Sequence, residues 1–184
     1  MSGDIRRAFT TKYTGKGLQL INRIVIHPPR QFSEIQFDKI AVNAIWDTGA
    51  THSCISSRLA KQLKLIPNSK RTTNTAGGLK TSDVYTIDIQ LPNRVIMPSV
   101  MVAEIDLIDS VDALIGMDII GEGDFAVNSY EGITSFSFRL PSCHTVDYAN
   151  TENKRNEKKL SSTEKQKKKA KRKQANKSRK KNRK

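Results

Sequence analysis

The stretch Asp47-Thr48-Gly49-Ala50 holds the residues whose types and spacing are best suited to chemistry. It follows the largely apolar run 40–46, so its carboxylate stands where a buried strand ends and is poorly solvated. Thr48 adds a short hydroxyl, Gly49 permits a tight turn, and Ala50 keeps the space open. Two such carboxylates, about 3 Å apart, cannot both ionise. If a second copy of the loop meets this one, one carboxyl acts as base and the other as acid.

Two further elements follow the motif in a fixed order. The run Ala113-Leu114-Ile115-Gly116 places apolar residues before a glycine, and Thr75-Ala76-Gly77-Gly78 lies between it and the motif. In order and approximate spacing, over residues 18–140, these elements resemble the retropepsin-like aspartic proteases. In that family a strand crosses behind the catalytic loop and a flap hairpin lies between the two.

The resemblance implies an all-β fold, mainly strands with one short helix, in a small closed acid-protease barrel that supplies one lobe per chain. It implies a homodimeric aspartic endopeptidase that needs no cofactor or metal and cleaves a peptide or protein substrate. Asp47 of each protomer is then catalytic, and residues 76–78 close over the substrate. The supporting residues are Thr48, Gly49, Ala50 and Gly116, and the flap residues are Ala76, Gly77 and Gly78.

Two positions depart from the viral members of the family. Those members usually carry an acidic residue after the alanine and an arginine after the downstream glycine, and the two pair. Here Thr51 and Met117 stand in these places, so both partners are absent together. The Gly116-Met117-Asp118 form is more similar to cellular and bacterial members.

Each motif also has a plainer interpretation. An Asp-Thr-Gly turn can simply cap a strand, and Gly-Gly is common in ordinary hairpins. A fold does not guarantee an activity. A catalytically silent retropepsin-like module that dimerises or binds a partner is therefore the main alternative, and a nucleic-acid-associated protein acting through a basic tail is another.

Alternating apolar residues predict several short strands. The period changes after the motif, where Ile55, Leu59 and Leu63 recur every fourth residue. This spacing predicts a short helix over 57–64 with Ser56 as its cap. The strands are expected at 18–26, 35–46, from Val84 to about Ile89, 95–105, 125–128 and 134–140.

The charge is confined to one end of the chain. Of the net +14, residues 151–184 carry 17 Lys or Arg against 3 Asp or Glu, which is +14, so residues 1–150 are neutral. We therefore expect a polar N-terminal segment over 1–14, a protease domain over 15–145 and a basic tail over 146–184. The tail has too few apolar residues to form a core and is predicted to be disordered.

The tail admits several partners. Residues 151–184 could bind RNA or DNA phosphates without sequence specificity, dock an acidic protein, or only solubilise the chain. No aromatic residues interleave the charges in that range to stack on bases.

The start of the sequence is polar and does not resemble a signal peptide, and the longest apolar runs are too short to span a membrane. With two cysteines and no disulfide framework, we expect a cytoplasmic protein. Chemically, Cys54, Cys143, His52 and His144 could be zinc ligands, but their spacing fits no common zinc motif. The aspartates Asp106, Asp109, Asp112, Asp118 and Asp124 are expected to be solvated or capping residues.

Overall fold

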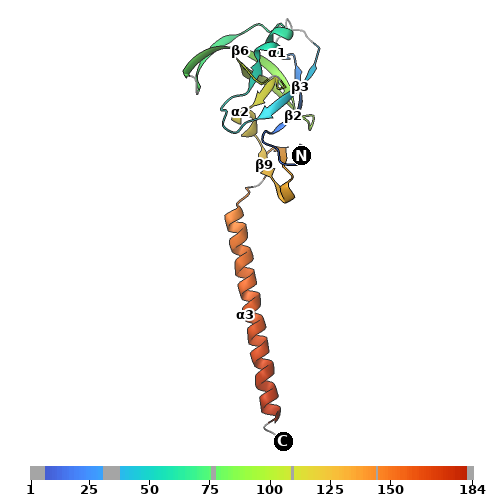
Figure 1. The fold of residues 1–184 in the computed structure, drawn as a ribbon, viewed down its shortest axis with the longest axis vertical. Coiled ribbons are helices and arrows are strands. Elements are labelled where there is room, and N and C mark those ends of the chain that lie inside the picture. Colours follow the sequence, from blue (N-terminus) through green and yellow to red (C-terminus); the bar gives the residue numbers. More distant parts are fainter. Residues whose placement is uncertain (1–6, 31–37, 76–77, 109, 144, 182–184) are drawn as a thin grey trace, which may run out of the picture. The chain divides into compact units, whose positions relative to one another are not determined.

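The computed structural model describes residues 7–30, 38–75, 78–108, 110–143 and 145–181. The chain forms two compact units, Met1–Cys143 and His144–Lys184. Within the described ranges, the first unit consists of strands and three short helical segments (Figure 1). The all-β fold class predicted from the sequence is therefore confirmed.

The larger sheet has the strand order β2-β3-β8-β4-β7-β6-β5. Its strands are β2 (Ile21–His27), β3 (Ile40–Trp46), β8 (Ala113–Ile115), β4 (Cys54–Ser56), β7 (Ile96–Ile105), β6 (Gly78–Gln90) and β5 (Ser69–Thr75). Strand β2 also pairs with the far end of β6, where Ile26 lies opposite Ile89, so the sheet curls back on itself. The sequence had predicted a closed barrel. The sheet is curled but not strictly closed, and a smaller sheet is separate from it.

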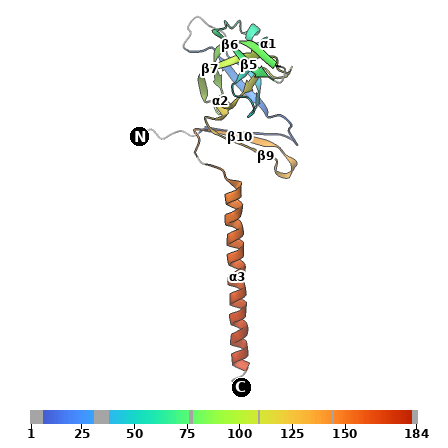
Figure 2. The same cartoon turned by 90° about the vertical axis from the view of Figure 1, so that its left-hand side faces the viewer.

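The smaller sheet contains β1 (Arg7–Lys12), β10 (Ser135–Leu140) and β9 (Asp124–Asn128), with β10 in the middle. Figure 2 shows β9 and β10 side by side at one end of the first unit. The sequence predicted a polar segment over 1–14 but no strand within it. Strand β1 pairs antiparallel with β10 along its whole length, from Arg7 opposite Leu140 to Lys12 opposite Ser135. Because β1 and β10 are far apart in the chain, no local pattern in the sequence predicts that they pair.

The core is built by alternation along the strands. Ile24 and Ile26 of β2 are buried, as their even spacing predicted. An aromatic cluster joins the two sheets: Trp46 stacks on Phe125 with ring centroids 5.6 Å apart and planes 7° apart. The other rings that pack on Trp46 are those of Phe9, Phe136 and Phe138. The residue immediately before Asp47 is thereby fixed in the core.

The first unit contains short helical segments between its strands. Helix α1 (Ser57–Gln62) begins as predicted, because the Ser56 hydroxyl accepts a hydrogen bond from the Leu59 amide at 3.0 Å. It ends two residues earlier than the pattern suggested. The sequence did not reveal helix α2 (Met117–Ile120). The 3-10 turn η1 (Tyr130–Gly132) lies between the last two predicted strands, where the sequence predicts a turn at Glu131-Gly132.

The second unit contains helix α3 (Tyr148–Lys181). The structure therefore differs from the disordered tail that we predicted from the lack of apolar residues. The physical reason is propensity: the segment has no glycine or proline and is rich in Lys, Arg, Glu, Gln and Ala, which favour helix without any core. In the described part of the chain, no helix combines the length and the apolar character that crossing a membrane requires.

Candidate active site

The Asp47 loop begins where two parallel strands end. Strands β3 and β8 pair so that Trp46 lies opposite Ile115. The Asp47 amide donates a hydrogen bond to the Ile115 carbonyl at 3.0 Å, and the Ala50 amide donates to the Asp47 carbonyl at 3.2 Å. The backbone therefore turns immediately after the aspartate, and the downstream strand predicted to lie behind the motif fixes the first residue of the turn.

The Asp47 carboxylate is half-buried and is held by its own loop. Its Oδ1 accepts a hydrogen bond from the Gly49 amide at 2.8 Å. Within the described residues Oδ2 accepts none, so one oxygen is fixed and the other is available. The Thr48 side chain is exposed, as is Gly49, while Ala50 is half-buried. A carboxylate placed in this way can accept a proton or bind a water on its outer side.

Gly116 allows the downstream segment to touch the loop. A Cβ built on this residue would lie 2.7 Å from the carbonyl carbon of His52 and 2.9 Å from the Ala50 oxygen, closer than side chains pack. A hydrogen bond stabilises this contact: the Met117 amide donates to the Ala50 carbonyl at 2.8 Å. Any side chain at position 116 would push the loop away from β8.

A second clamp, between Ser53 and Asp118, was missed from the sequence. The Asp118 Oδ1 accepts from the Ser53 hydroxyl at 2.7 Å, and Oδ2 accepts from the Ser53 amide at 2.9 Å. The Ser53 oxygen in turn accepts from the Gly116 amide at 3.1 Å. Asp118 had been expected to be solvated or capping, but it ties the loop to α2. The only sequence signal for this clamp was the Gly116-Met117-Asp118 form, and it does not indicate that Ser53 is the partner of Asp118.

Thr51 and Met117 stand where viral members carry a paired acidic residue and arginine, and neither is charged. Thr51 and Met117 are both exposed. The backbone performs the bridging instead, because the Asp118 amide donates to the Thr51 carbonyl at 3.2 Å. The loop is therefore anchored by main-chain bonds and by Asp118.

A hairpin lies where the flap was predicted. Strands β5 and β6 pair from Ser69 opposite Val84 to Thr75 opposite Gly78. The first strand of this hairpin ends at Thr75 and the second begins at Gly78. Gly78 has a φ of +103°, which disfavours other residues. Ala76 and Gly77, the other two predicted flap residues, lie outside the described residues.

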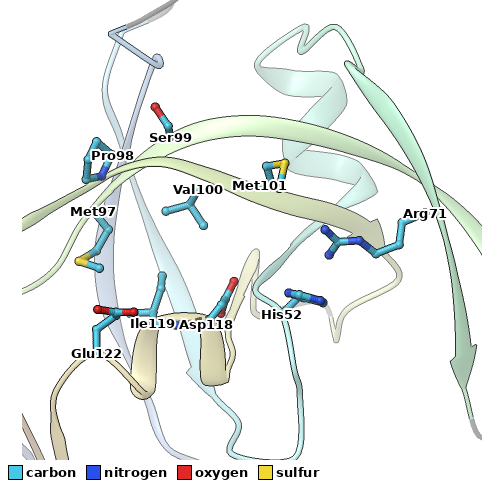
Figure 3. A pocket seen from close by; sticks show the side chains of 10 residues that line it. All are labelled: His52, Arg71, Met97, Pro98, Ser99, Val100, Met101, Asp118, Ile119 and Glu122. Carbon is cyan, nitrogen blue, oxygen red and sulfur yellow. Dashed lines mark hydrogen bonds between the residues drawn. The ribbon is translucent and has the colours of Figure 1, made fainter.

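A pocket of about 290 Å³ lies beside the loop (Figure 3). Its walls come from four places: β5, β7, the loop after Asp47, and α2 with the turn that follows it. Apolar side chains of β7 and α2 make up much of the lining, among them Met97, Val100 and Ile119. At one end lie Arg71 of β5 and His52 of the loop, while Glu122 lies at the other. No pattern in the sequence predicted this pocket.

Three of the other aspartates singled out from the sequence accept hydrogen bonds or form ion pairs. Asp112 accepts from Ser56 and Arg58 at the start of α1, and Asp106 accepts from Lys80 at 2.8 Å. Asp124 accepts from the Arg139 side chain, the Ser142 hydroxyl and the Cys143 amide. These hydrogen bonds hold the pKa of the Asp124 carboxyl well below its usual range. Asp109 lies outside the described residues.

No metal centre is formed by the described residues. Among them, no group of three or more His, Cys, Asp or Glu side chains could hold a metal ion, and His144 lies outside them. Burial raises the pKa of the Cys54 thiol, which keeps it protonated at neutral pH.

Comparison with known proteins places the loop in a family. Residues 33–119 match the family described as "Aspartyl protease". Among solved structures, a retropepsin-like aspartic protease from Rickettsia conorii is similar at 13% identity, over 73% of this chain and 94% of that chain, with a TM-score of 0.47. The retroviral protease-like domain of Ddi1 from Leishmania major is similar at 16% identity, over 58% and 80%, with a TM-score of 0.34.

No curated protein matched the sequence. The family match contains the whole Asp47 loop, Gly116 and Asp118, which are the residues that the hydrogen bonds above bring together. Over residues 33–119, which hold the Asp47 loop, this chain is similar to the aspartyl protease family.

Proposed function

We propose that this chain is an aspartic endopeptidase that hydrolyses peptide bonds with a water activated by two Asp47 carboxyls, one from each of two protomers. The observation that carries the proposal is the Asp47 geometry. The Gly49 amide holds one carboxylate oxygen at 2.8 Å, while the other makes no hydrogen bond within the described residues. The exposed Thr48 and Gly49 leave this side of the loop open.

The dimer is required because the sequence contains one Asp-Thr-Gly motif. An isologous twofold interface would bring the same loop of each protomer to the axis. Thr48 would then hydrogen-bond across the axis, and residues 76–78 of the flap would cover the substrate and exclude water.

The chemistry needs only the shared proton. One Asp47 carboxylate takes a proton from the water as its oxygen attacks the peptide carbonyl carbon. The other Asp47, protonated, donates to the carbonyl oxygen as the tetrahedral intermediate forms. When the C–N bond breaks, the leaving nitrogen receives a proton from the dyad, and no covalent intermediate with the enzyme forms.

The test uses a peptide library across a pH series, with and without an aspartic-protease inhibitor. Asp47→Asn should reduce cleavage by at least about 10³-fold, because an amide cannot share the proton, yet it is nearly isosteric and should preserve the fold. Asp38→Asn is the matched control, since Asp38 is exposed and lies outside the loop. Cleavage by Asp47→Asn at the parent's rate would refute the assignment.

The dimer has its own test. Specific activity should fall on dilution, in step with the dimer fraction measured by sedimentation, because one protomer holds half a site. A fully active monomer would contradict the mechanism.

A second candidate function is favoured by α3: a dimeric module that binds polyanions through its tail. Side chains over residues 162–173 are exposed, and seven of these twelve residues are Lys or Arg. A protein that dimerises and binds RNA, yet cleaves nothing in the library at any pH, would support this candidate over the enzyme.

A further inference from the structure

The guanidinium of Arg71 has one buried nitrogen that donates to no other described residue. Its Nη1 atom is buried and has no hydrogen-bond partner among the described residues. Nor is Arg71 in an ion pair there, whereas its neighbour Lys70 pairs with Asp83 at 3.6 Å. Leaving a buried charged donor unsatisfied is costly, so such a group calls for a partner from outside the fold.

The unpaired guanidinium faces the pocket beside the Asp47 loop. Figure 3 shows the Arg71 side chain extending from β5 toward the pocket, above His52. His52 is five residues after Asp47, on the loop that Gly116 and Asp118 anchor. The pocket is thus built on the same frame as Asp47, and an extended peptide held at the loop could place a side chain in it.

The charged residues of the pocket determine what kind of ligand group it can bind. Asp118 is already occupied, because its oxygens accept three hydrogen bonds, from the Ser53 hydroxyl, the Ser53 amide and the Ile119 amide. Glu122, an exposed residue, lies at the end away from Arg71. One unpaired cation with two carboxylates in the same lining suits a singly charged anion better than a doubly charged phosphate.

The apolar walls select the shape. Met97, Val100 and Ile119 line the space between the two ends. They suit the methylene groups of a side chain, while the planar guanidinium suits a carboxylate at its tip, which it can bind with two parallel hydrogen bonds.

We propose that this pocket is a specificity subsite for an acidic side chain of the substrate, with Arg71 as the residue that recognises its carboxylate. The inference rests on the proposed peptidase function. It assigns a substrate class, peptides with Glu or Asp at one position away from the cleaved bond.

The experiment moves a single Glu, and separately a Gln, through each of four positions on either side of the cleaved bond of a good library substrate. For the parent, one position should favour Glu over Gln by at least about tenfold in kcat/KM, the lower end expected for a hydrogen bond between charged groups. Arg71→Gln should bring this ratio close to one, and Arg71→Glu should favour Lys at the same position.

Lys70→Gln is the matched control, because it removes the same charge from the preceding residue of β5, which already pairs with Asp83. It should keep the Glu preference of the parent. Melting temperatures of all variants establish that they fold. No Glu-dependent position in the parent, or an equal preference in Arg71→Gln, would overturn the proposal.

A binding measurement separates this failure from failure of the peptidase proposal. If no peptide is cleaved, the peptidase proposal fails, and the pocket is tested with ¹⁵N-labelled protein. The Arg71 Nε–Hε resonance should move on addition of N-acetylglutamate amide and not of N-acetylglutamine amide. An equal response to both compounds, or to neither, would show that the pocket does not recognise an acidic side chain.

Discussion

At the scale of single residues, the position of the Asp47 loop depends more on its close contact with Gly116 than on hydrogen bonds within the motif. Among the described residues, the Asp47 carboxylate accepts a hydrogen bond only from Gly49, two residues away. What keeps the loop against β8 is the absence of a side chain at Gly116 and the Ser53–Asp118 clamp. Mutations at these supporting positions should therefore affect stability as well as activity.

The sharpest residue-scale prediction concerns Gly116. Gly116→Ala should lower the free energy of unfolding by about 1–3 kcal/mol, since the new methyl would meet backbone atoms of His52 and Ala50. Gly15→Ala is the control, because a Cβ there has nothing within 4 Å. Urea titration of both variants measures the difference. Equal urea midpoints for the two variants would show that the loop accommodates the methyl group without loss of stability.

At the scale of elements, the segment after β10 is fastened to β9. Asp124, the first residue of β9, accepts hydrogen bonds from Arg139 of β10, from Ser142 at 2.6 Å and from the Cys143 amide at 2.9 Å. These bonds favour the ionised carboxyl and lower its pKa. Their contribution therefore persists at the acidic pH at which an aspartic dyad would be assayed.

The pH dependence of stability follows from the sign of that shift. Because the pKa of Asp124 is lower in the folded protein than in the unfolded chain, its contribution is present above about pH 4, the ordinary Asp pKa, and is lost as the pH falls through the folded value. Asp124→Asn should therefore destabilise the protein most near neutral pH, with a gap from the parent that narrows below pH 4. Thermal melts between pH 2 and 7 measure this gap. A gap that widens in acid would contradict the ionised network.

At the scale of the whole molecule, the two units have different physical bases. The first has a buried core and is neutral in net charge over residues 1–150, whereas the second owes its helix to propensity and holds the whole +14 over 151–184. An isolated helix without an apolar face is of marginal stability in water, so α3 should be sensitive to temperature and salt.

Truncation after Asn150 tests the separation of the units. It should change the melting temperature of the first unit by less than about 2 °C, since the removed residues supply no core. It should remove most RNA binding and its steep salt dependence, which comes from counterion release, while peptide cleavage persists. Melting temperature, RNA binding at two salt concentrations and peptide cleavage, compared between the two forms, measure these effects. A large loss of stability, or equal RNA binding, would contradict the separation.

The sequence by itself determined the features that local chemistry encodes. Alternation predicted the buried face of β2, and the period of four with Ser56 predicted α1. The apolar run 40–46 placed Asp47 at a strand end, and the resemblance carried by the motif order implied the fold class. Propensity could have given α3 as well, because the segment has no helix breaker. We predicted disorder instead, because we weighed the absence of a core above the helix propensity of the backbone.

Only the tertiary structure decided the contacts between distant residues. The pairing of β1 with β10, the Ser53–Asp118 clamp and the pocket that contains Arg71 each join segments dozens of residues apart. Such contacts depend on the register and curl of the sheet, which no local pattern of residues specifies. The sequence therefore identified the residue suited to chemistry, and the tertiary structure decided what surrounds it.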